Sequence, residues 1–193
     1  MALKRILPRA ASPITLALAK QHCRVTHSDD DAIINLYIQA AGDHIEGNRG
    51  VLGRALVNQS WELTYDAFPS GALEIPLGPL ASVTSIEYAH PDTGIMTTMN
   101  AANYMVDTAS WQGWVSPVDV WPDTRETLNA VKITFVAGHG ATADDVPADI
   151  KMAMLHLISH WYENREAVDI GNVTSSIPLT FDTLIGAVRK ITV

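Results

Sequence analysis

The sequence predicts an α+β fold in which helices and strands occupy different parts of the chain. Apolar residues recur at helical spacing near the beginning, alternate with a period of two in the middle, and return to helical spacing from residue 148. Segregation of this kind favours α+β over an alternating α/β fold. We therefore expect a helical bundle of two N-terminal helices and one long C-terminal helix, with an inserted antiparallel β-sheet or sandwich and an extended C-terminal tail.

The same changes of period divide the chain. Residues 1–12 are predicted to be a flexible basic arm, and residues 169–193 a tail that contains one short amphipathic helix. Residues 13–50 and 147–168 form the predicted helical part. Residues 55–138 form a β-rich insertion between its two segments.

Start signals and apolar spacing justify the helices. Thr15 can cap the first helix, and Ser28 or Asp29 can cap the second. Pro147 favours the start of the long C-terminal helix directly after it. Apolar residues at helical spacing predict the helical core, which comprises Ile34, Ile38, Ile45, Met154, Leu157, Ile158 and Trp161.

Alternation and turn signals justify the strands of the insertion. In the run VKITFVA, the residues Val131, Ile133, Phe135 and Ala137 lie on one side of the strand. The run LVNQSWELTYDAF alternates in part, and turns rich in Gly, Pro and Asp separate such runs. Short strands spaced closely by turns are typical of a small antiparallel sheet or sandwich.

Composition restricts the function. The 193 residues carry a formal net charge of −8, whereas a protein that binds nucleic acid by itself normally has a basic face. Cys23 is the only cysteine, so no intrachain disulfide is possible, which suits a reducing compartment. No apolar run approaches the roughly 20 residues of a membrane helix. We therefore expect no membrane partner.

The stretch MLHLISHWYENREAV raises the question of a metal site. His156 and His160 are four residues apart, so they share one face of a helix and could chelate an ion together. A zinc protease needs a Glu directly after the first His, where this chain has Leu157. Glu163 lies about 10.5 Å along the helix from His156, too far for both to reach one ion. We expect no metal, but a metal-dependent enzyme using the two histidines is the alternative hypothesis.

The run VKITFVAGHGATADD superficially matches a dinucleotide-binding fingerprint. That motif requires a helix to begin on the glycines, so that its N-terminus meets the pyrophosphate. Here Asp144, Asp145 and Pro147 intervene, and two carboxylates would repel a phosphate. We therefore expect a glycine turn at Gly138 and Gly140, and no cofactor.

Three tryptophans, Trp111, Trp114 and Trp121, cluster in a loop-rich stretch of the insertion. Core packing is one interpretation of the cluster. The other is an exposed protein-contact surface, where tryptophan is enriched.

Five blocks of the sequence also resemble a known family. In chain order they are TLALAKQHCRVTHSDDDAIINLYIQAA, GRALVNQSWELTYDAFP, IPLGPLASVTSIEY, NYMVD and VKITFVAGHGATADDVPADIKMAMLHLISHWYENREAV. Together they cover about residues 13–190, and the last block is the most specific. The chain resembles the head–tail connector, or adaptor, proteins of long-tailed bacteriophages, prophages and gene transfer agents.

The resemblance implies a virion structural protein without catalysis or cofactor. Members form a ring, usually of twelve subunits, beneath the capsid portal, where the ring extends the DNA channel and docks the next neck or tail protein. The implied location is the neck of a virion or phage-like particle, after assembly in the bacterial cytoplasm. The C-terminal segment of such proteins reaches toward the portal. The implied portal contacts are Phe181, Leu184, Ile185, Val188 and Arg189.

Ring formation gives the polar side of the long helix a role. Ring subunits associate head-to-tail, so each needs two different contact faces. The expected subunit contacts are His156, His160, Glu163 and Arg165.

Charge also bears on the passage of double-stranded DNA. Twelve copies at −8 would total roughly −96 before counterion screening, so DNA could pass through the channel without sequence-specific binding. A DNA-packaging accessory protein that uses Lys4, Arg5 and Arg9 is a further alternative.

Overall fold

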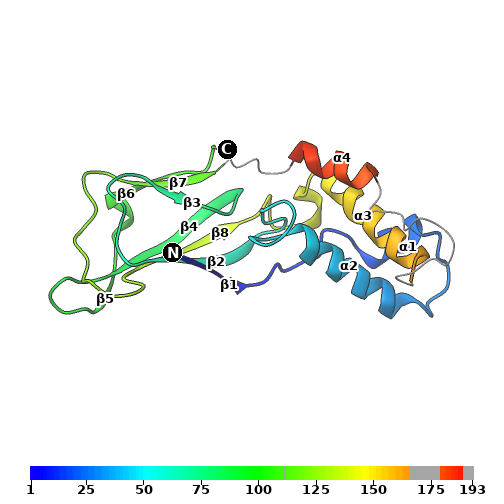
Figure 1. The fold of residues 1–193 in the computed structure, drawn as a ribbon, viewed down its shortest axis with the longest axis horizontal. Helices are drawn as coiled ribbons and strands as arrows, with labels where there is room; N and C mark the ends of the chain where they lie inside the picture. Colours follow the sequence, from blue (N-terminus) through cyan, green and yellow to red (C-terminus); the bar gives the residue numbers. More distant parts are fainter. Residues whose placement is uncertain (111, 166–178, 189–193) are drawn as a thin grey trace. The chain divides into compact units, whose positions relative to one another are not determined.

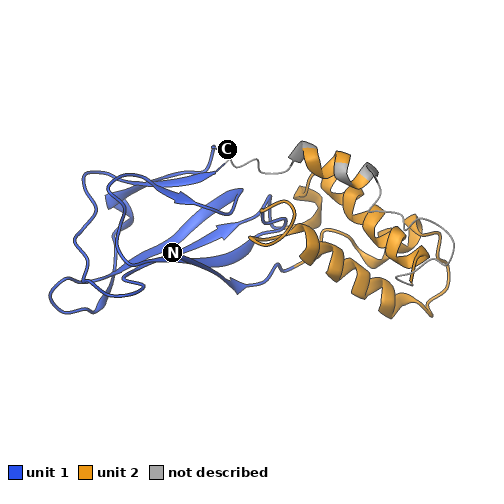
Figure 2. Ribbon diagram, in the orientation of Figure 1, with its two compact units in different colours: residues 1–10, 54–141 blue, residues 11–53, 142–193 orange. Residues whose placement is uncertain are grey.

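The computed structural model of the chain describes residues 1–110, 112–165 and 179–188, and divides into two compact units (Figure 2). Residues 1–10 and 54–141 form the β unit, and residues 11–53 and 142–193 form the helical unit. The chain therefore leaves the helical unit after Gly53 and returns to it at Thr142. The predicted α+β fold is confirmed.

The larger sheet of the β unit has five strands in the order β1-β2-β8-β4-β5 (Figure 1). Their bounds are β1 Ala2–Leu7, β2 Gln59–Tyr65, β8 Val131–Ala137, β4 Leu80–Ala89 and β5 Met96–Thr98. Every neighbouring pair is antiparallel. Strand β8 is buried at every second residue, as its alternation predicts, because one face of the sheet covers the core.

The smaller sheet has three antiparallel strands in the order β3-β7-β6, namely β3 Leu73–Ile75, β7 Gly113–Pro117 and β6 Tyr104–Asp107. A one-turn 3₁₀ helix, η1 Ala101–Asn103, precedes β6. The buried core of the unit combines side chains from both sheets, including Leu63 and Phe135 from the larger one. Each such side chain contributes about 1.5–3 kcal/mol when fully buried.

Strand β1 corrects the prediction of a flexible basic arm at residues 1–12. Residues Ala2–Leu7 pair with β2 in antiparallel register, which places Lys4 opposite Glu62 and Arg5 opposite Trp61. Leu3 packs against the core of the β unit. The main-chain hydrogen bonds and this single apolar contact order a segment whose other residues are mostly exposed.

Among its described residues, the helical unit contains four α-helices, α1 Leu16–His22, α2 Asp31–Ile45, α3 Ala148–Glu163 and α4 Leu179–Val188. Helices α2 and α4 both pack on α3, and α1 contacts α2 and α3. Six of the predicted core residues are buried: Ile34, Ile38, Ile45, Met154, Leu157 and Ile158. Trp161 is only partly buried, because it lies at the rim of the bundle, with its ring centroid 6.3 Å from that of Tyr37.

Two helices begin where the sequence predicts, and one begins at a different residue. The Thr15 hydroxyl accepts a hydrogen bond from the Leu18 amide at 3.2 Å, and α3 begins directly after Pro147, both as predicted. Helix α2, in contrast, begins after Asp30 rather than after Ser28 or Asp29. The Asp30 side chain makes no capping hydrogen bond, and its carboxylate instead binds Tyr162 of α3 and Arg165 just after that helix.

The glycine turn after β8 is confirmed. Gly138 has φ = 149°, and a Cβ atom there would lie 2.4 Å from the backbone nitrogen of Asn58. The close approach comes from backbone hydrogen bonds that join the two ends of the insertion. The Asn58 amide donates to the carbonyl of Gly140, and the His139 amide donates to that of Leu56. Close packing of the backbone is therefore a sufficient reason for a glycine at position 138.

Candidate functional site

His156, one of the two histidines of α3 that the sequence singled out, contacts another helix. The ring of His156 meets that of His22 on α1 edge-on, with centroids 5.7 Å apart. Burial lowers the pKa of His22, the neighbouring His156 lowers it further, and Glu163 partly opposes both effects. Within the part of the chain that the structure describes, no group of three or more His, Cys, Asp or Glu side chains could hold a metal ion. The contact is a structural one between two helices.

The other polar residues of this stripe lie at the end of α3. The side-chain amide of Asn164 donates to the carbonyl of His160 at 2.9 Å, which closes the last turn of the helix. Glu163 is exposed, and His156 and His160 are partly buried. A contact between these residues and a neighbouring subunit remains a prediction.

Arg165 takes part in a cluster that the sequence did not reveal. The Asp30 carboxylate accepts hydrogen bonds from the Tyr162 hydroxyl at 2.6 Å and from the Arg165 guanidinium at 3.0 Å. The guanidinium also lies 4.8 Å from the centroid of the Tyr162 ring. We call Asp30, Tyr162 and Arg165 the Asp30 cluster. It joins the start of α2 to the end of α3, so Arg165 already has a partner inside its own unit.

The Asp30 cluster perturbs the ionisation of its members. The hydrogen bond from Tyr162, and then the contacts with Arg165, hold the pKa of Asp30 below its usual value. The same hydrogen bond raises the pKa of Tyr162, because ionised Tyr162 could no longer donate it. Both shifts favour ionised Asp30 and neutral Tyr162 at neutral pH. These are the two states in which the hydrogen bond between them can form.

Helix α4 uses much of its apolar face within the helical unit. Phe181 and Ile185 are each only 2% exposed, and the Phe181 ring centroid lies 6.1 Å from that of His44. Leu184 is partly buried. The side chain of Val188 and the whole of Arg189 lie outside the described residues. In this structure the side chains of Phe181 and Ile185 therefore face α3 and its neighbours, and their contact with a portal stays a prediction.

The β unit carries a groove beside an aromatic stack. Phe68 and Trp121 stack face to face with centroids 4.6 Å apart, and the Trp121 indole N–H donates to the carbonyl of Gly71 at 2.7 Å. The groove has a volume of about 470 Å³, and four carboxylates contribute to its lining, with neither Lys nor Arg among its described lining residues. These carboxylates belong to Asp66, Asp119, Asp123 and Glu126. We call this feature the Phe68–Trp121 groove.

The tryptophan cluster thus has more than one role. Trp121 is partly buried and lines the groove, so it joins core packing to an open surface. Trp114, on β7, is also partly buried. Trp111 lies outside the described residues. Trp121 lines the groove together with Phe68, on which it stacks and which is far away in the sequence.

The described residues define a two-unit α+β protein whose open surfaces suit contacts with other macromolecules. Among the described residues, no helix has the length and apolar character needed to span a bilayer. The described polar lining of the groove consists of carboxylates, hydroxyls, the Trp121 indole N–H and backbone.

Comparison with known proteins identifies relatives of this fold. Residues 13–92 match the family model of the phage gp6-like head-tail connector protein. A search of curated proteins found no match. The family match includes α1, α2 and strands β2 to β4, but stops before the block at residues 131–168 that the sequence marked as most specific.

Solved structures match the chain over its full length. A chain in the virion of a native gene transfer agent particle is 24% identical, with a TM-score of 0.81, and the match covers 100% of this chain and 97% of that one. A chain in the neck of an empty gene transfer agent particle, computed with C6 symmetry, is also 24% identical, with a TM-score of 0.80 and the same coverage. A chain in the neck of a native particle, computed with C12 symmetry, is 20% identical, with a TM-score of 0.73, again over 100% and 97% of the two chains. These likenesses show a shared fold, and with the family model they confirm the predicted resemblance to head–tail connectors.

Proposed function

We propose that this chain is a structural subunit of a head–tail connector, which assembles into a ring in the neck of a phage-like particle. The observation that carries the proposal is the full-length fold match to chains of gene transfer agent particles, at a TM-score of 0.81. The family model for head–tail connectors supports it independently over residues 13–92. We propose no catalytic role and no cofactor.

The proposed ring has twelve subunits and lies beneath the portal. One of the similar neck structures was computed with C12 symmetry and another with C6 symmetry, and both symmetries are compatible with a ring of twelve. In this assembly one end of the ring docks on the portal and the other receives the next neck or tail protein. A ring needs two unlike contact faces on each subunit. The chain offers surfaces of different chemistry in its two units.

The proposed channel passes double-stranded DNA without sequence-specific binding. Each subunit has a formal net charge of −8, so the ring as a whole repels phosphate. The repulsion lowers the affinity of the channel wall for DNA and allows the duplex to slide. A ring of this charge does not suit a DNA-packaging accessory protein that grips the duplex.

Electron microscopy of the purified protein tests the proposal. The chain should form rings, either alone at high concentration or together with the portal protein of the same particle. Particle images would give the symmetry, and native mass spectrometry would count the subunits. A protein that stays strictly monomeric under both conditions would refute the proposed function.

A second measurement tests the tail contact that the resemblance implies. The variant Leu184→Glu changes a partly buried residue of α4 and leaves the buried Phe181 and Ile185 in place. We expect weaker capture of the portal protein at unchanged helical content. If the folded variant captures the portal protein normally, the proposed contact between α4 and the portal is wrong.

A further inference from the structure

The exposed apolar side chains of the chain are unevenly distributed. Of thirteen large hydrophobic residues that the described part of the chain exposes, ten belong to the β unit. Three of them, Ile6, Leu7 and Val120, are 45%, 60% and 83% exposed. Single exposed apolar residues are ordinary, but Ile6 and Leu7 are adjacent on one strand and Val120 lies on the wall of a groove, and these two places are candidate contact surfaces.

The first place is strand β1, which forms one edge of the five-stranded sheet. Its exposed side chains are Lys4, Arg5, Ile6 and Leu7, and we call these four the basic β1 surface. A register shift between Arg5 and Leu7 interrupts the pairing with β2 at Ile6. A bulge of this kind turns a side chain away from the regular sheet face. Within the described residues, neither Lys4 nor Arg5 forms an ion pair.

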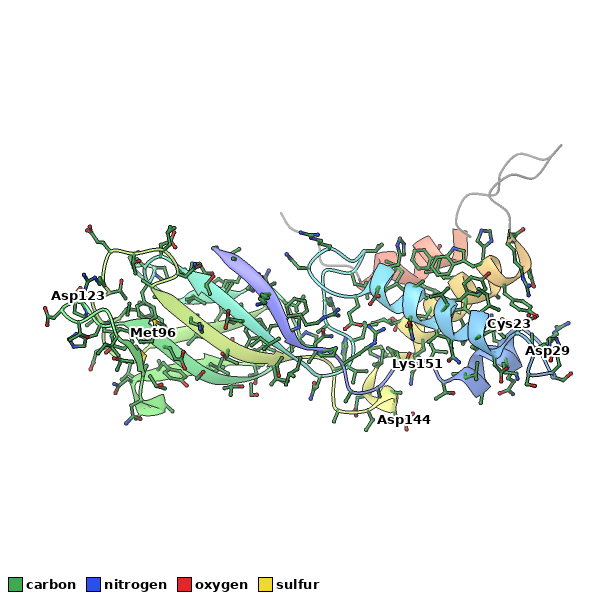
Figure 3. All side chains as sticks on the ribbon, turned by 90° about the horizontal axis from the view of Figure 1, so that it is seen from below. Cys23, Asp29, Met96, Asp123, Asp144 and Lys151 are labelled. Carbon is green, nitrogen blue, oxygen red and sulfur yellow. The ribbon has the colours of Figure 1, made fainter. Side chains whose placement is uncertain are left out.

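The second place is the Phe68–Trp121 groove. Asp119, Asp123 and Glu126 on its wall are exposed, and Val120 stands between the first two of them. Figure 3 shows Asp123 at one end of the β unit, with its side chain pointing outward. The groove is built rigidly, because Trp121 is stacked on Phe68 and hydrogen-bonded to the Gly71 carbonyl. A second tie joins its rim, where the Asn129 amide donates to the Asp66 carboxylate at 2.8 Å.

The two surfaces are complementary. Successive side chains of a strand alternate between its faces, so the basic β1 surface offers one cation on each side of the strand edge, together with two exposed aliphatic side chains. The groove offers carboxylates around aromatic and aliphatic side chains. We infer that the basic β1 surface of one copy of this chain docks in the Phe68–Trp121 groove of the next copy. The inference rests on the proposed ring and names the pair of unlike faces that joins its subunits.

Physical reasons favour a second copy as the occupant. The first nine residues hold three of the chain's thirteen Lys and Arg residues, so the chain itself supplies a concentrated basic and apolar segment. The match is heterologous, because a strand edge meets a groove, and heterologous contacts generate closed rings when the rotation permits. Buried apolar residues supply affinity, and the charges set the register and exclude wrong partners.

Charge exchange tests this contact. The variant Lys4→Glu/Arg5→Glu reverses the charge of the basic β1 surface, and the variant Asp119→Lys/Asp123→Lys reverses the charge at two positions of the groove. We expect either variant to reduce the fraction of protein in rings at least about tenfold, since like charges then meet at the interface. A chain that carries all four changes should form rings to within about threefold of the unmodified protein.

The control is Asp29→Lys, which reverses a carboxylate whose side chain is 91% exposed on the helical unit. Its ring fraction should match that of the unmodified protein. Circular dichroism would verify that every variant folds, so that loss of rings reports the contact.

Each outcome has a separate meaning. If the unmodified protein forms rings and the four-change variant does not recover them, the β1–groove contact is wrong and the ring function stands. If reversal of the groove leaves rings intact but abolishes capture of the portal protein, the groove binds that protein and the inference again fails. If the unmodified protein never forms rings, both the proposed function and this inference are wrong.

A proximity measurement supplies an independent test. Arg5→Cys and Asp119→Cys would be made separately in a Cys23→Ser chain, mixed, and treated with a short bis-maleimide. We expect a cross-linked dimer from this mixture, and at least about fivefold less from a mixture of Arg5→Cys with Asp29→Cys, where effective concentration gives no advantage. Equal yields from the two mixtures would overturn the contact.

Discussion

The two units differ in how they use their side chains. In the helical unit, polar residues of different helices bind one another, as in the Asp30 cluster and in the ion pair between Lys20 and Asp31 at 2.5 Å. In the β unit, β1 exposes Lys4 and Arg5, and the groove exposes Asp119, Asp123 and Glu126. In the helical unit these polar contacts are internal, whereas in the β unit the charged residues that carry the proposed contact with a second copy are exposed.

The largest effect should come from the core of the β unit. Phe135 is fully buried between the sheets, and Phe135→Ala should lower the free energy of unfolding by about 3–5 kcal/mol. Val120 lies in the same unit but is 83% exposed, so Val120→Ala should change the free energy of unfolding by less than about 0.5 kcal/mol. Urea unfolding followed by tryptophan fluorescence measures both. Equal losses would show that the groove wall supports the fold.

A similar experiment tests whether α4 belongs to the core of the helical unit. Phe181→Ala should lower the free energy of unfolding by about 3 kcal/mol, because the ring is almost completely buried. Thr183, on the exposed side of α4, provides the matched position, and Thr183→Ala should have a much smaller effect. If Phe181→Ala is neutral, α4 does not stabilise the unit in solution.

The turn at Gly138 should show an intermediate effect. Gly138→Ala would place a methyl group against the backbone of Asn58 at a φ of 149°, and should cost about 1–3 kcal/mol. Gly71→Ala is the control, since an added Cβ there would meet no atom within 4 Å. Thermal unfolding of the two variants compares them directly. An unaffected Gly138→Ala would show that the two ends of the insertion can separate without loss.

Removal of one hydroxyl should weaken the Asp30 cluster by a smaller amount. Tyr162→Phe removes the 2.6 Å hydrogen bond to Asp30 and retains the ring beneath Arg165. The melting temperature should fall, and the pKa of Asp30, measured by NMR titration, should rise because its first cause of depression is lost. An unchanged Asp30 pKa would show that the Tyr162 hydroxyl does not bind Asp30 in solution.

The smallest effect concerns pH. The pKa of His22 is lowered in the folded state, so the unfolded chain binds a proton more readily. The contribution of His22 to stability is therefore complete above its unfolded value of 6.5 and is lost as the pH falls through the lower folded value. We expect His22→Gln to reduce the slope of stability against pH between about pH 7 and 5. A slope that stays the same would remove His22 as its source.

Local patterns predicted most of the fold. The alternation of β8, the Thr15 cap and the start of α3 depend on neighbouring residues, and the structure confirms all three. Strand β1 was missed because only Leu3 of its residues packs on the core, so no period of two is visible in the sequence.

The contact surfaces were harder to predict, because their parts are distant in the chain. Asp30 meets Tyr162 across 132 residues, and the local pattern of aspartates before α2 gave no sign of this contact. Trp121 was identified as a candidate for a surface contact, but its partner Phe68 gave no signal of its own. The pairing of these residues depends on how the sheets close, which local spacing does not determine.

The hydrogen bonds that join Asn58 to Gly140 and Leu56 to His139 also bear on how the chain folds. They bring the two ends of the insertion together, so a folded β unit acts toward α2 and α3 as a short loop rather than as a long one. Each halving of a loop saves about 0.6 kcal/mol of closure entropy, and shortening residues 54–141 to a few effective residues saves about 2 kcal/mol. The β unit should therefore fold first and speed the association of α2 with α3, and a variant that opens this junction should slow folding of the helical unit without touching any of its side chains.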